Sequence, residues 1–204
     1  MTAPSAFCTF PRISNAGAVF ANFRYFAHNP TEHIGVTNLI IPMIESATAA
    51  QAVVAATRYP PQGVRGVGSA LARASRWNRS SDYLVNAGEG LTVTVQVESV
   101  AGLAALPDIA AVEGVDAVFI GPADLAASMG HLGRPDVPEV VEAVEEAIRM
   151  VTACNKAAGV NAFDESLAHR YMAAGARFVL VGADVALLAR GSEALATRYR
   201  CGNQ

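Results

Sequence analysis

Two carboxylate side chains follow apolar runs that are typical of buried β-strands. Glu98 ends the run 91–98, and Asp124 follows the run 117–120 with only Gly-Pro-Ala between. A lone carboxylate is costly to bury, so each should be paired, hydrogen-bonded or bound to a cation. Two alternatives stay open: Asp124 could cap the next helix, and Glu98 could be a favourable charge at a helix N-terminus.

Carboxylate oxygens predict a hard divalent cation, Mg²⁺ or Mn²⁺, in preference to zinc. The 4 histidines are scattered along the chain and no CxxC is present, so no zinc-binding spacing is found. A cation held by Glu98 and Asp124 has room for a bidentate 2-oxo acid, and it would act as a Lewis acid while an enolate forms.

Arg24 lies in the short apolar and aromatic run 22–26, which we predict to be a strand. A guanidinium in such a run needs an anionic partner, and a substrate carboxylate or an enolate oxygen would serve. The alternative is an ordinary structural ion pair. Arg73, Arg76 and Arg79 recur at every third position, which indicates a solvated or interface face of a helix.

Short apolar runs alternate with longer amphipathic or alanine-rich segments. The predicted strands are residues 22–26, 38–43, 91–98, 117–120, 159–163 and 177–181, and the predicted helices are residues 46–58, 70–86, 100–111, 138–158, 165–174 and 185–198. Ser46 and Asp164 are predicted caps. Strands that are apolar on both faces and separated by helices form parallel sheets, so the predicted fold class is α/β.

Roughly six βα units without a dinucleotide-binding fingerprint favour a (β/α)₈ TIM-type barrel over a doubly wound sheet. A full barrel usually needs about 250 residues. We therefore expect an incomplete barrel, forming one domain over residues 1–204 with a divergent N-terminal segment at residues 1–33.

Composition limits the class of partner. Hydrophobic residues make up 52% and charged residues 16% of the chain, which excludes disorder and favours a homo-oligomer. With 15 basic and 18 acidic residues the net charge is −3, so no basic footprint for nucleic acid is present. No apolar run approaches the ~20 residues that span a bilayer, no secretory signal is found, and the 3 cysteines are widely spaced. We expect a cytoplasmic protein without a membrane partner.

Several long motifs resemble those of the HpcH/HpaI aldolase family, and more narrowly its 4-hydroxy-2-oxoheptanedioate (2,4-dihydroxyhept-2-ene-1,7-dioate) aldolases. The longest is RYPPQGVRGVGSALARASRWNR at residues 58–79. It is followed in order by VQVE at 95–98, FIGPADL at 119–125 and LLARG at 187–191. The resemblance covers about residues 34–200.

The resemblance implies a metal-dependent class II pyruvate aldolase on a barrel. Such an enzyme cleaves a 4-hydroxy-2-oxo acid to pyruvate and an aldehyde through a metal-bound enolate. By position, Glu98 and Asp124 match the metal ligands, and Gln96 matches a residue beside the bound substrate. Ala123 and Asp124 match backbone contacts to the pyruvate carboxylate, and Arg24 matches the arginine that holds the enolate. The resemblance also implies Mg²⁺ or Mn²⁺, with Co²⁺ as a further candidate, and a hexamer in which a C-terminal helix packs on a neighbour.

The sequence departs from the family on its N-terminal side. The family's catalytic histidine lies in an Asp-Gly-Glu-His motif that is not found here, and His33 stands where the family has an acidic residue before Ile-Gly. One hypothesis is an aldolase ancestry with the metal and enolate half intact, in which oxaloacetate decarboxylation survives better than aldol cleavage. The other is a catalytically silent barrel that serves as an assembled scaffold. A third alternative has His28 or His33 as the base.

Overall fold

The computed structural model describes residues 19–20, 35–68 and 71–200. Its centre is a six-stranded sheet in which every neighbouring pair of strands is parallel. The strands lie side by side in chain order, from β1 to β6. Their bounds are β1 Val19–Phe20, β2 Asn38–Ile41, β3 Thr92–Val97, β4 Ala117–Ile120, β5 Ala157–Asn161 and β6 Phe178–Leu180.

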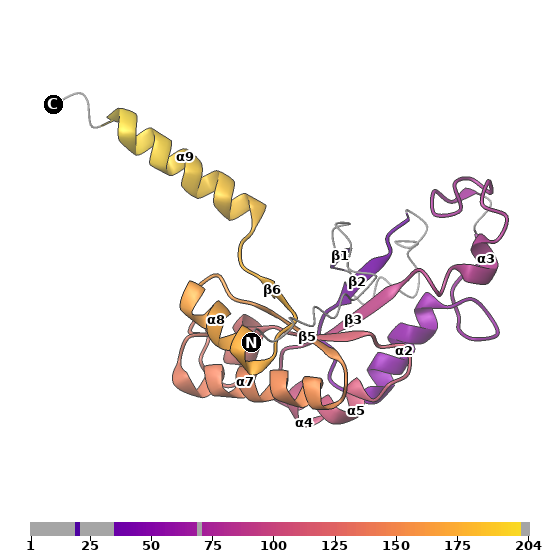
Figure 1. Ribbon diagram of the computed structural model, residues 1–204, viewed down its shortest axis with the longest axis horizontal. Helices are drawn as coiled ribbons and strands as arrows, with labels where there is room; N and C mark the ends of the chain where they lie inside the picture. The colour runs from indigo at the N-terminus through magenta and orange to yellow at the C-terminus, as the bar shows by residue number, and fades with distance from the viewer. Residues whose placement is uncertain (1–18, 21–34, 69–70, 201–204) are drawn as a thin grey trace, which may run out of the picture.

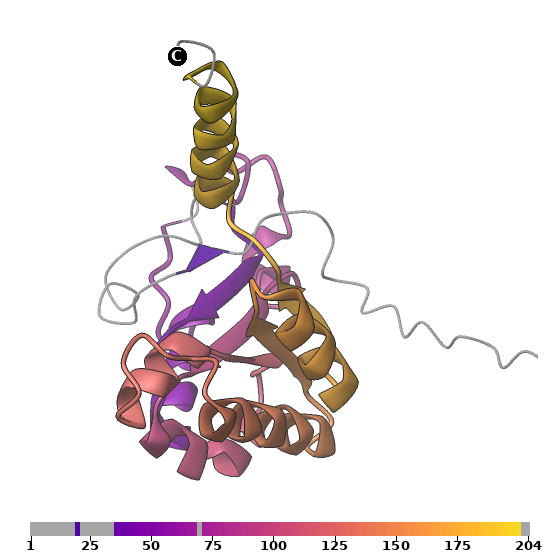
Figure 2. The ribbon, with the colours of Figure 1, turned by 90° about the vertical axis from the view of Figure 1, so that its left-hand side faces the viewer.

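Helices cover one side of this sheet (Figure 1), and the view turned by 90° shows the same arrangement (Figure 2). The helices of the described residues are α2 Ala47–Thr57, α3 Tyr83–Asn86, α4 Val100–Ala104, α5 Leu106–Ala110, α6 Pro122–Ser128, α7 Pro138–Ala153, α8 Glu165–Ala174 and α9 Asp184–Arg200. Of these, α3 and α9 bury no residue and are not part of the layer that covers the sheet. A doubly wound sheet has helices on both faces and a reversal of strand order. A sheet with strands in chain order and helices on one side is instead a half-barrel of the α/β class, which confirms the predicted class.

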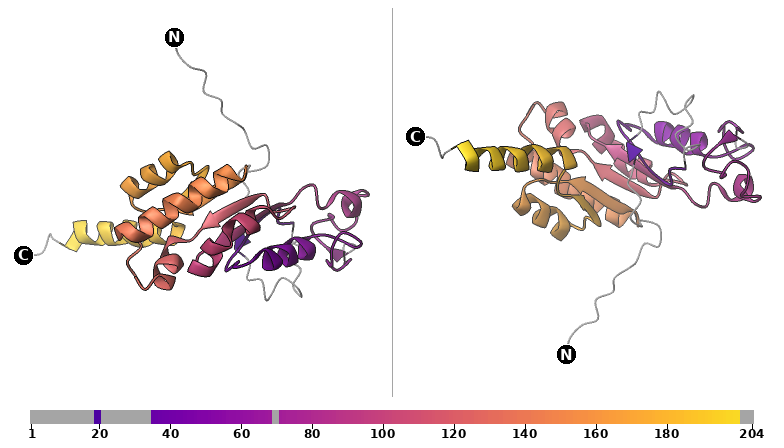
Figure 3. Two further views of the ribbon diagram at one scale, coloured as in Figure 1. Left: turned by 90° about the horizontal axis from the view of Figure 1, so that it is seen from below. Right: turned by 90° about the horizontal axis from the view of Figure 1, so that it is seen from above.

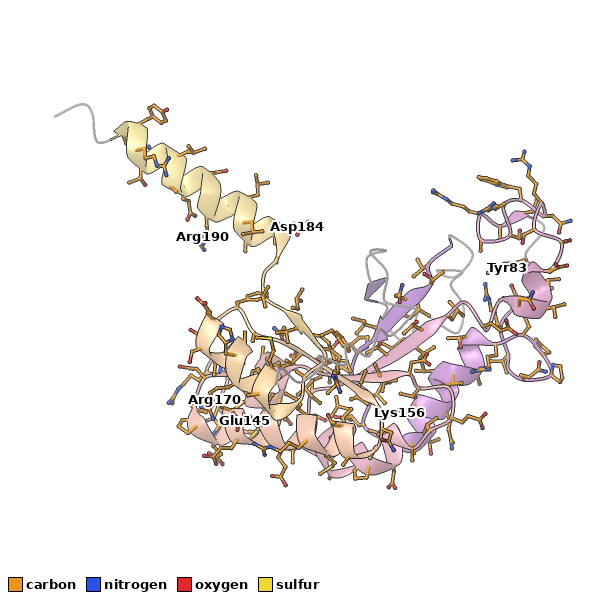
Figure 4. All side chains as sticks on the ribbon, in the orientation of Figure 1. Tyr83, Glu145, Lys156, Arg170, Asp184 and Arg190 are labelled. Carbon is orange, nitrogen blue, oxygen red and sulfur yellow. The ribbon has the colours of Figure 1, made fainter. Side chains whose placement is uncertain are left out.

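The hydrophobic core lies between the sheet and its helices. Alternate residues along β3 (Val93, Val95 and Val97) point into this core, as period-two strand geometry requires. α7 contributes Val144 and Ile148 from the facing stripe of its surface. An ion pair between Glu145 of α7 and Arg170 of α8, with Nε to Oε1 at 2.8 Å, joins the outer edges of these two helices (Figure 4).

The opposite face of the sheet is also partly filled. Phe119 of β4 and Phe178 of β6 meet with ring centroids 5.9 Å apart. They meet across β5, where Gly159 leaves room for the Phe178 ring. The sheet is therefore buried on both faces at β4 and β5, which is typical of parallel strands.

The amino ends of the strands are fastened by side chains. Lys156, just before β5, donates a hydrogen bond from Nζ to the Val115 carbonyl at 2.6 Å (Figure 4). Asp116, just before β4, accepts a bond from the Val93 N–H at 2.7 Å. These contacts fix the register of β3, β4 and β5 at the amino ends of the strands, opposite to the end at which Glu98 lies.

Most predicted elements are confirmed, and two helix starts are capped as expected. The strand 117–120 and the helix 165–174 have the predicted bounds, and the helices predicted at 46–58 and 185–198 agree within two residues at each end. The Ser46 side chain accepts from the Ala49 N–H, and the Asp164 side chain accepts from the Leu167 N–H.

The helix predicted over residues 70–86 was wrong, because within the described part of this range, residues 71–86, the α-helix is limited to Tyr83–Asn86. Arg76, Trp77 and Asn78 have φ angles of 52°, 55° and 63°, which a right-handed helix excludes. The Ser75 hydroxyl donates to the Ala72 carbonyl and accepts from the Asn78 N–H. Side-chain bonds of this kind offer the backbone an alternative to a helix.

Two other predicted helices and one predicted strand have clearly different bounds in the structure. The predicted helix 138–158 ends at Ala153, since Asn155 is left-handed (φ 57°), and the strand predicted at 159–163 begins earlier, at Ala157. The predicted helix 100–111 is two short helices that meet at Ala105, where Pro107 opens the second. The predicted strand 22–26 lies outside the described residues, whereas Val19–Phe20, which we did not predict, is a strand.

The C-terminal helix α9 extends away from the sheet (Figures 1 and 3). It buries none of its residues, and its apolar side chains Val185, Leu187, Leu188, Leu195 and Tyr199 are all exposed. None of the helices in the described ranges is both long and apolar enough to cross a bilayer.

Replacing Gly159 by alanine should destabilise the sheet. A Cβ at this position would overlap the ring of Phe178, and overpacking of this kind costs about 1–3 kcal/mol. We expect Gly159→Ala to lower the melting temperature by several degrees, since 1 kcal/mol shifts it by roughly 2–4 °C at this chain length. Gly182→Ala is the matched control, because nothing lies within 4 Å of its added Cβ. Equal melting temperatures for the two variants would contradict this packing.

Candidate active site

The two predicted carboxylates lie at the carboxyl ends of adjacent strands. Glu98 directly follows β3, and Asp124 lies in the first turn of α6, which follows β4. The register pairs Val97 of β3 with Ile120 of β4, so the two strands end at the same level of the sheet. The charge of Asp124 contributes to raising the pKa of Glu98. The two side chains are therefore close enough to interact electrostatically.

Glu98 is a buried carboxylate, only 4% exposed. Its Oε1 accepts a hydrogen bond from the Met43 N–H at 3.0 Å, and its Oε2 accepts one from the Gln96 side-chain amide. Burial is the largest influence and raises its pKa, and the negative charge of Asp124 acts in the same direction. The bonds from Met43 and Gln96 lower the pKa, but the net shift is upward. The surroundings of Glu98 thus disfavour its charged form, which a bound cation would favour.

This donor set fits a divalent cation that prefers oxygen ligands. Each Glu98 oxygen accepts one bond from the protein, which leaves lone pairs for a further partner. Mg²⁺ is usually bound through one or two carboxylates and keeps its other positions for water or substrate oxygens. Within residues 35–68 and 71–200, no group of three or more His, Cys, Asp or Glu side chains is placed to hold a metal. Glu98 and Asp124 would therefore act as a two-carboxylate set.

Gly121 makes the space in which Glu98 and Gln96 meet. A Cβ at Gly121 would lie 2.5 Å from Glu98 Oε2 and 2.8 Å from Gln96 Nε2, closer than real Cβ contacts. The glycine lies between β4 and α6, where it is the N-cap residue of the helix. A side chain at this position would push the carboxylate and the amide apart.

The first turn of α6 presents main-chain N–H groups beside Glu98. The first bond within the helix runs from the Leu125 N–H to the Gly121 carbonyl, so the N–H groups of Ala123 and Asp124 are not used by the helix. No side chain caps this end. Asp124 is not the N-cap residue, although a first-turn carboxylate is favourable there in its own right. Ala123 and Asp124 are both exposed.

Several residues named from the sequence lie elsewhere. Arg24, His28 and His33 fall outside the described residues. His131 contacts Glu139 at 3.0 Å, and His169 lies 3.8 Å from Glu165. Neither of these two described imidazoles is bonded to Glu98 or Asp124.

Two cavities lie at the opposite, amino ends of the strands. A cavity of about 440 Å³ is lined by residues that precede or begin β3 and β4, among them Leu91, Val93, Gly114 and Asp116. A second cavity of about 390 Å³ lies beside Thr37 and Leu91, again at the amino ends of strands. In parallel α/β sheets ligands bind at the carboxyl ends. The chemistry of the carboxylates therefore outweighs cavity size in locating the candidate site.

Sequence reasoning missed Met43 and Gly121 as parts of the site. Met43 contacts Glu98 through its backbone, so its residue type gives no signal. Gly121 could have been suspected, since a glycine directly after an apolar strand often marks a close approach of another group. A second contact, from the Ser99 hydroxyl to Glu45 at 2.6 Å, also joins the loop after β2 to the end of β3.

The pKa of Glu98 predicts a pH-dependent stability difference in metal-free protein. The native pKa is raised above the unfolded value, so protonation favours the folded state. The stabilisation is fully present below the unfolded pKa and is lost as the pH rises through the native pKa. Glu98→Gln should therefore match the wild type at about pH 4 and have a larger free energy of unfolding at pH 7.

Urea unfolding at a series of pH values, with a chelator present, measures this difference. Glu165→Gln is the control, since Glu165 is an exposed carboxylate in the first turn of α8 and its replacement should not stabilise the protein at pH 7. A Glu98→Gln variant that is less stable than the wild type at pH 7 would show that the buried charge is well solvated by its surroundings.

A second prediction concerns Gly121. Gly121→Ala should displace Glu98 or Gln96, lower stability by about 1–3 kcal/mol and weaken divalent-cation binding. Gly88→Ala is the control, because nothing lies within 4 Å of its added Cβ. Calorimetric titration with Mn²⁺ measures the binding, and unchanged affinity in Gly121→Ala would mean that the Glu98–Gln96 contact is not needed for it.

Comparison with known proteins places this arrangement in a family. The model of the HpcH/HpaI aldolase/citrate lyase family matches residues 26–191. The hydroxypyruvate/pyruvate aldolase of Pseudomonas aeruginosa is 56% identical over 169 residues, which are 83% of this chain and 63% of that protein. The 4-hydroxy-2-oxo-heptane-1,7-dioate aldolase of Klebsiella pneumoniae is 54% identical over 166 residues, 81% of this chain and 63% of that protein.

A solved structure gives the same result. The crystal structure of an HpcH/HpaI aldolase/citrate lyase family protein from Burkholderia cenocepacia J2315 superposes with a TM-score of 0.78 at 38% identity, covering 83% of this chain and 67% of that one. The chain spans 63% of the length of the two curated relatives. Because the family model covers most of the chain and the relatives are more than half identical to it, the chain belongs to the HpcH/HpaI aldolase/citrate lyase family.

Proposed function

We propose that this chain carries the metal and pyruvate-binding part of an aldolase. The reaction is cleavage of a 4-hydroxy-2-oxo acid, of the 4-hydroxy-2-oxoheptanedioate type, to pyruvate and an aldehyde. The observation that carries the proposal is the buried Glu98 carboxylate at the end of β3, with Asp124 after the end of the adjacent strand β4. Two relatives at 54–56% identity are named as aldolases of 2-oxo acids, which supports the same chemistry.

Each residue has a distinct role in the proposal. Glu98 and Asp124 would hold a divalent cation, Mg²⁺ or Mn²⁺ and also Co²⁺, which when bound supplies Lewis-acid polarisation of a keto group. Gln96 keeps the Glu98 carboxylate oriented and lies beside the substrate. The N–H groups of Ala123 and Asp124 bind the substrate carboxylate, as unsatisfied helix N–H groups do.

Arg24 completes the proposed site from outside the described residues. Its guanidinium would stabilise the negative oxygen that develops on the pyruvate fragment. In cleavage, a base takes the proton of the C4 hydroxyl, the C3–C4 bond breaks and the aldehyde leaves. The electron pair of that bond passes to the pyruvate enolate, which then takes a proton at C3.

The reaction also needs a general base for the C4 hydroxyl. The described residues supply no candidate base in contact with Glu98 or Asp124. Removing a general base typically costs 10²–10⁴-fold in rate. Oxaloacetate decarboxylation reaches the same enolate by loss of CO₂, without removing a hydroxyl proton. We therefore expect decarboxylation to survive better than aldol cleavage when each rate is compared with that of a relative that has the base.

The fold and assembly belong to the same proposal. The six strands in chain order are consecutive strands of a (β/α)₈ barrel whose active site lies at the carboxyl ends. The protein assembles as a homo-oligomer, a hexamer by family resemblance, in which α9 packs on a neighbouring copy. The exposure of every apolar side chain of α9 supports this assembly.

Activity with two substrates tests the proposal. With Mn²⁺ present, the wild-type chain should decarboxylate oxaloacetate, and Glu98→Gln and Asp124→Asn should each lower the rate about 100-fold or more. Glu165→Gln, an exposed carboxylate outside the site, should keep the wild-type rate. Compared with the Klebsiella pneumoniae relative, cleavage of 4-hydroxy-2-oxoheptanedioate should be reduced more than decarboxylation, and an equal reduction of both would contradict the loss of the base. Equal rates in the wild type and both site variants would contradict the assignment.

Melting temperature separates an enzyme from a silent scaffold. A ligand that binds only the native state raises the melting temperature, and the rise grows with the logarithm of the ligand concentration divided by the dissociation constant. Mn²⁺ with pyruvate should therefore raise the melting temperature of the wild type and leave that of Glu98→Gln unchanged. No shift in the wild type would favour a catalytically silent scaffold.

A further inference from the structure

The loop between β2 and α2 holds the end of β3 by three contacts. The Met43 N–H donates to Glu98 Oε1 at 3.0 Å, and the next N–H, of Ile44, donates to the Gln96 carbonyl at 3.0 Å. The Ser99 hydroxyl then donates to Glu45 Oε1 at 2.6 Å. Three successive residues of the loop thus contact Glu98 and two residues close to it in sequence.

Met43 adopts a backbone conformation that its residue type does not favour. Its φ angle is 59°, in the left-handed region that glycine and asparagine tolerate and that costs other residues free energy. Its side chain is 58% exposed, so burial of the methionine does not compensate for the strain. Strained backbone of this kind persists where the surroundings fix it and is frequent at functional sites.

The strain has a geometric consequence at Glu98. The left-handed residue turns the chain so that the N–H groups of Met43 and Ile44 both face β3, while the Ile44 side chain enters the core. Gln96 holds the other carboxylate oxygen, and Gly121 leaves the space for both. The carboxylate is therefore fixed from two sides, with lone pairs left over on each oxygen.

We infer that Met43 is a positioning residue whose main-chain N–H, presented by its left-handed backbone, aims the Glu98 carboxylate at the divalent cation. This inference rests on the proposed metal site. It adds Met43 to that site as a residue that acts on the cation only through Glu98. Groups that orient a metal ligand commonly change metal affinity 10–100-fold when they are removed. The methionine side chain itself has no part in this role.

Substitutions that differ in their tolerance of positive φ test the inference. Met43→Asn and Met43→Gly keep both the left-handed backbone and the N–H, so the Mn²⁺ dissociation constant should stay within about twofold of the wild type. Met43→Val has a β-branched side chain that disfavours positive φ, and its dissociation constant should rise about tenfold or more. Calorimetric titration of the full chain with Mn²⁺ gives all four values.

A second variant removes the donor directly. Replacing the amide N–H of residue 43 by an ester oxygen, with the α-hydroxy analogue of methionine, preserves the side chain and deletes one hydrogen bond. This variant should weaken Mn²⁺ binding about tenfold, and it decides the question if Met43→Val does not fold. A purely structural role would lower the melting temperature of the variants without changing the dissociation constant of the folded protein.

The outcomes separate this inference from the proposed function. If the wild type binds Mn²⁺ and the ester variant binds it equally well, Met43 does not position Glu98 and the inference is overturned while the metal site stands. If Met43→Asn and Met43→Gly lose affinity as Met43→Val does, the side chain matters and the inference is again overturned. A wild-type chain that binds no Mn²⁺ overturns the metal site and the inference together.

Discussion

Burial of the Glu98 charge is the constraint on which the candidate site depends. A carboxylate removed from water at the end of a strand needs donors, and the chain supplies them from the Met43 N–H and the Gln96 amide. These donors do not offset burial and the nearby Asp124 charge, since the pKa of Glu98 remains raised. A positive group bound beside Glu98 would favour its charged form and offset the cost of its burial. The left-handed backbone at Met43 presents an N–H to this carboxylate, and the absence of a side chain at Gly121 leaves space for it.

The sheet topology explains why two carboxylates distant in sequence come together. Strands that follow one another in chain order, with helices on one side, bring the end of each strand next to the end of the following one. Residues 117–120 predicted β4 because they are continuously apolar, which is typical of a strand buried on both faces. Residues 91–98 predicted β3 because leucine and valine alternate there with threonine, glutamine and glutamate, which is the period of a strand. The helix predicted over 70–86 failed because side-chain bonds of Ser75 and three left-handed residues override an alanine-rich helical pattern. Helix propensity is weak against such local competition.

The candidate site was predictable in its residue types but not in its supporting contacts. Glu98 and Asp124 were found because a charge at the end of an apolar strand is unusual, and the structure brings them within electrostatic reach. Gln96 was named through family resemblance, and its bond to Glu98 gives it a physical role. Met43 could not be predicted, since a backbone N–H is common to almost all residues and a left-handed φ has no signal in a methionine. Arg24 remains a prediction that lies outside the described residues.

The central claim is that Glu98 and Asp124 share one divalent cation, and a double-mutant cycle on Mn²⁺ affinity tests it most directly. The dissociation constants of the wild type, Glu98→Gln, Asp124→Asn and the double variant are measured by calorimetric titration at one pH and ionic strength. Residues that act on one ion couple strongly, whereas independent sites contribute additively. We expect one Mn²⁺ per chain, a large loss of affinity in each single variant, and little further loss in the double variant. Strictly additive losses, or single variants that bind as the wild type does, would contradict the shared site.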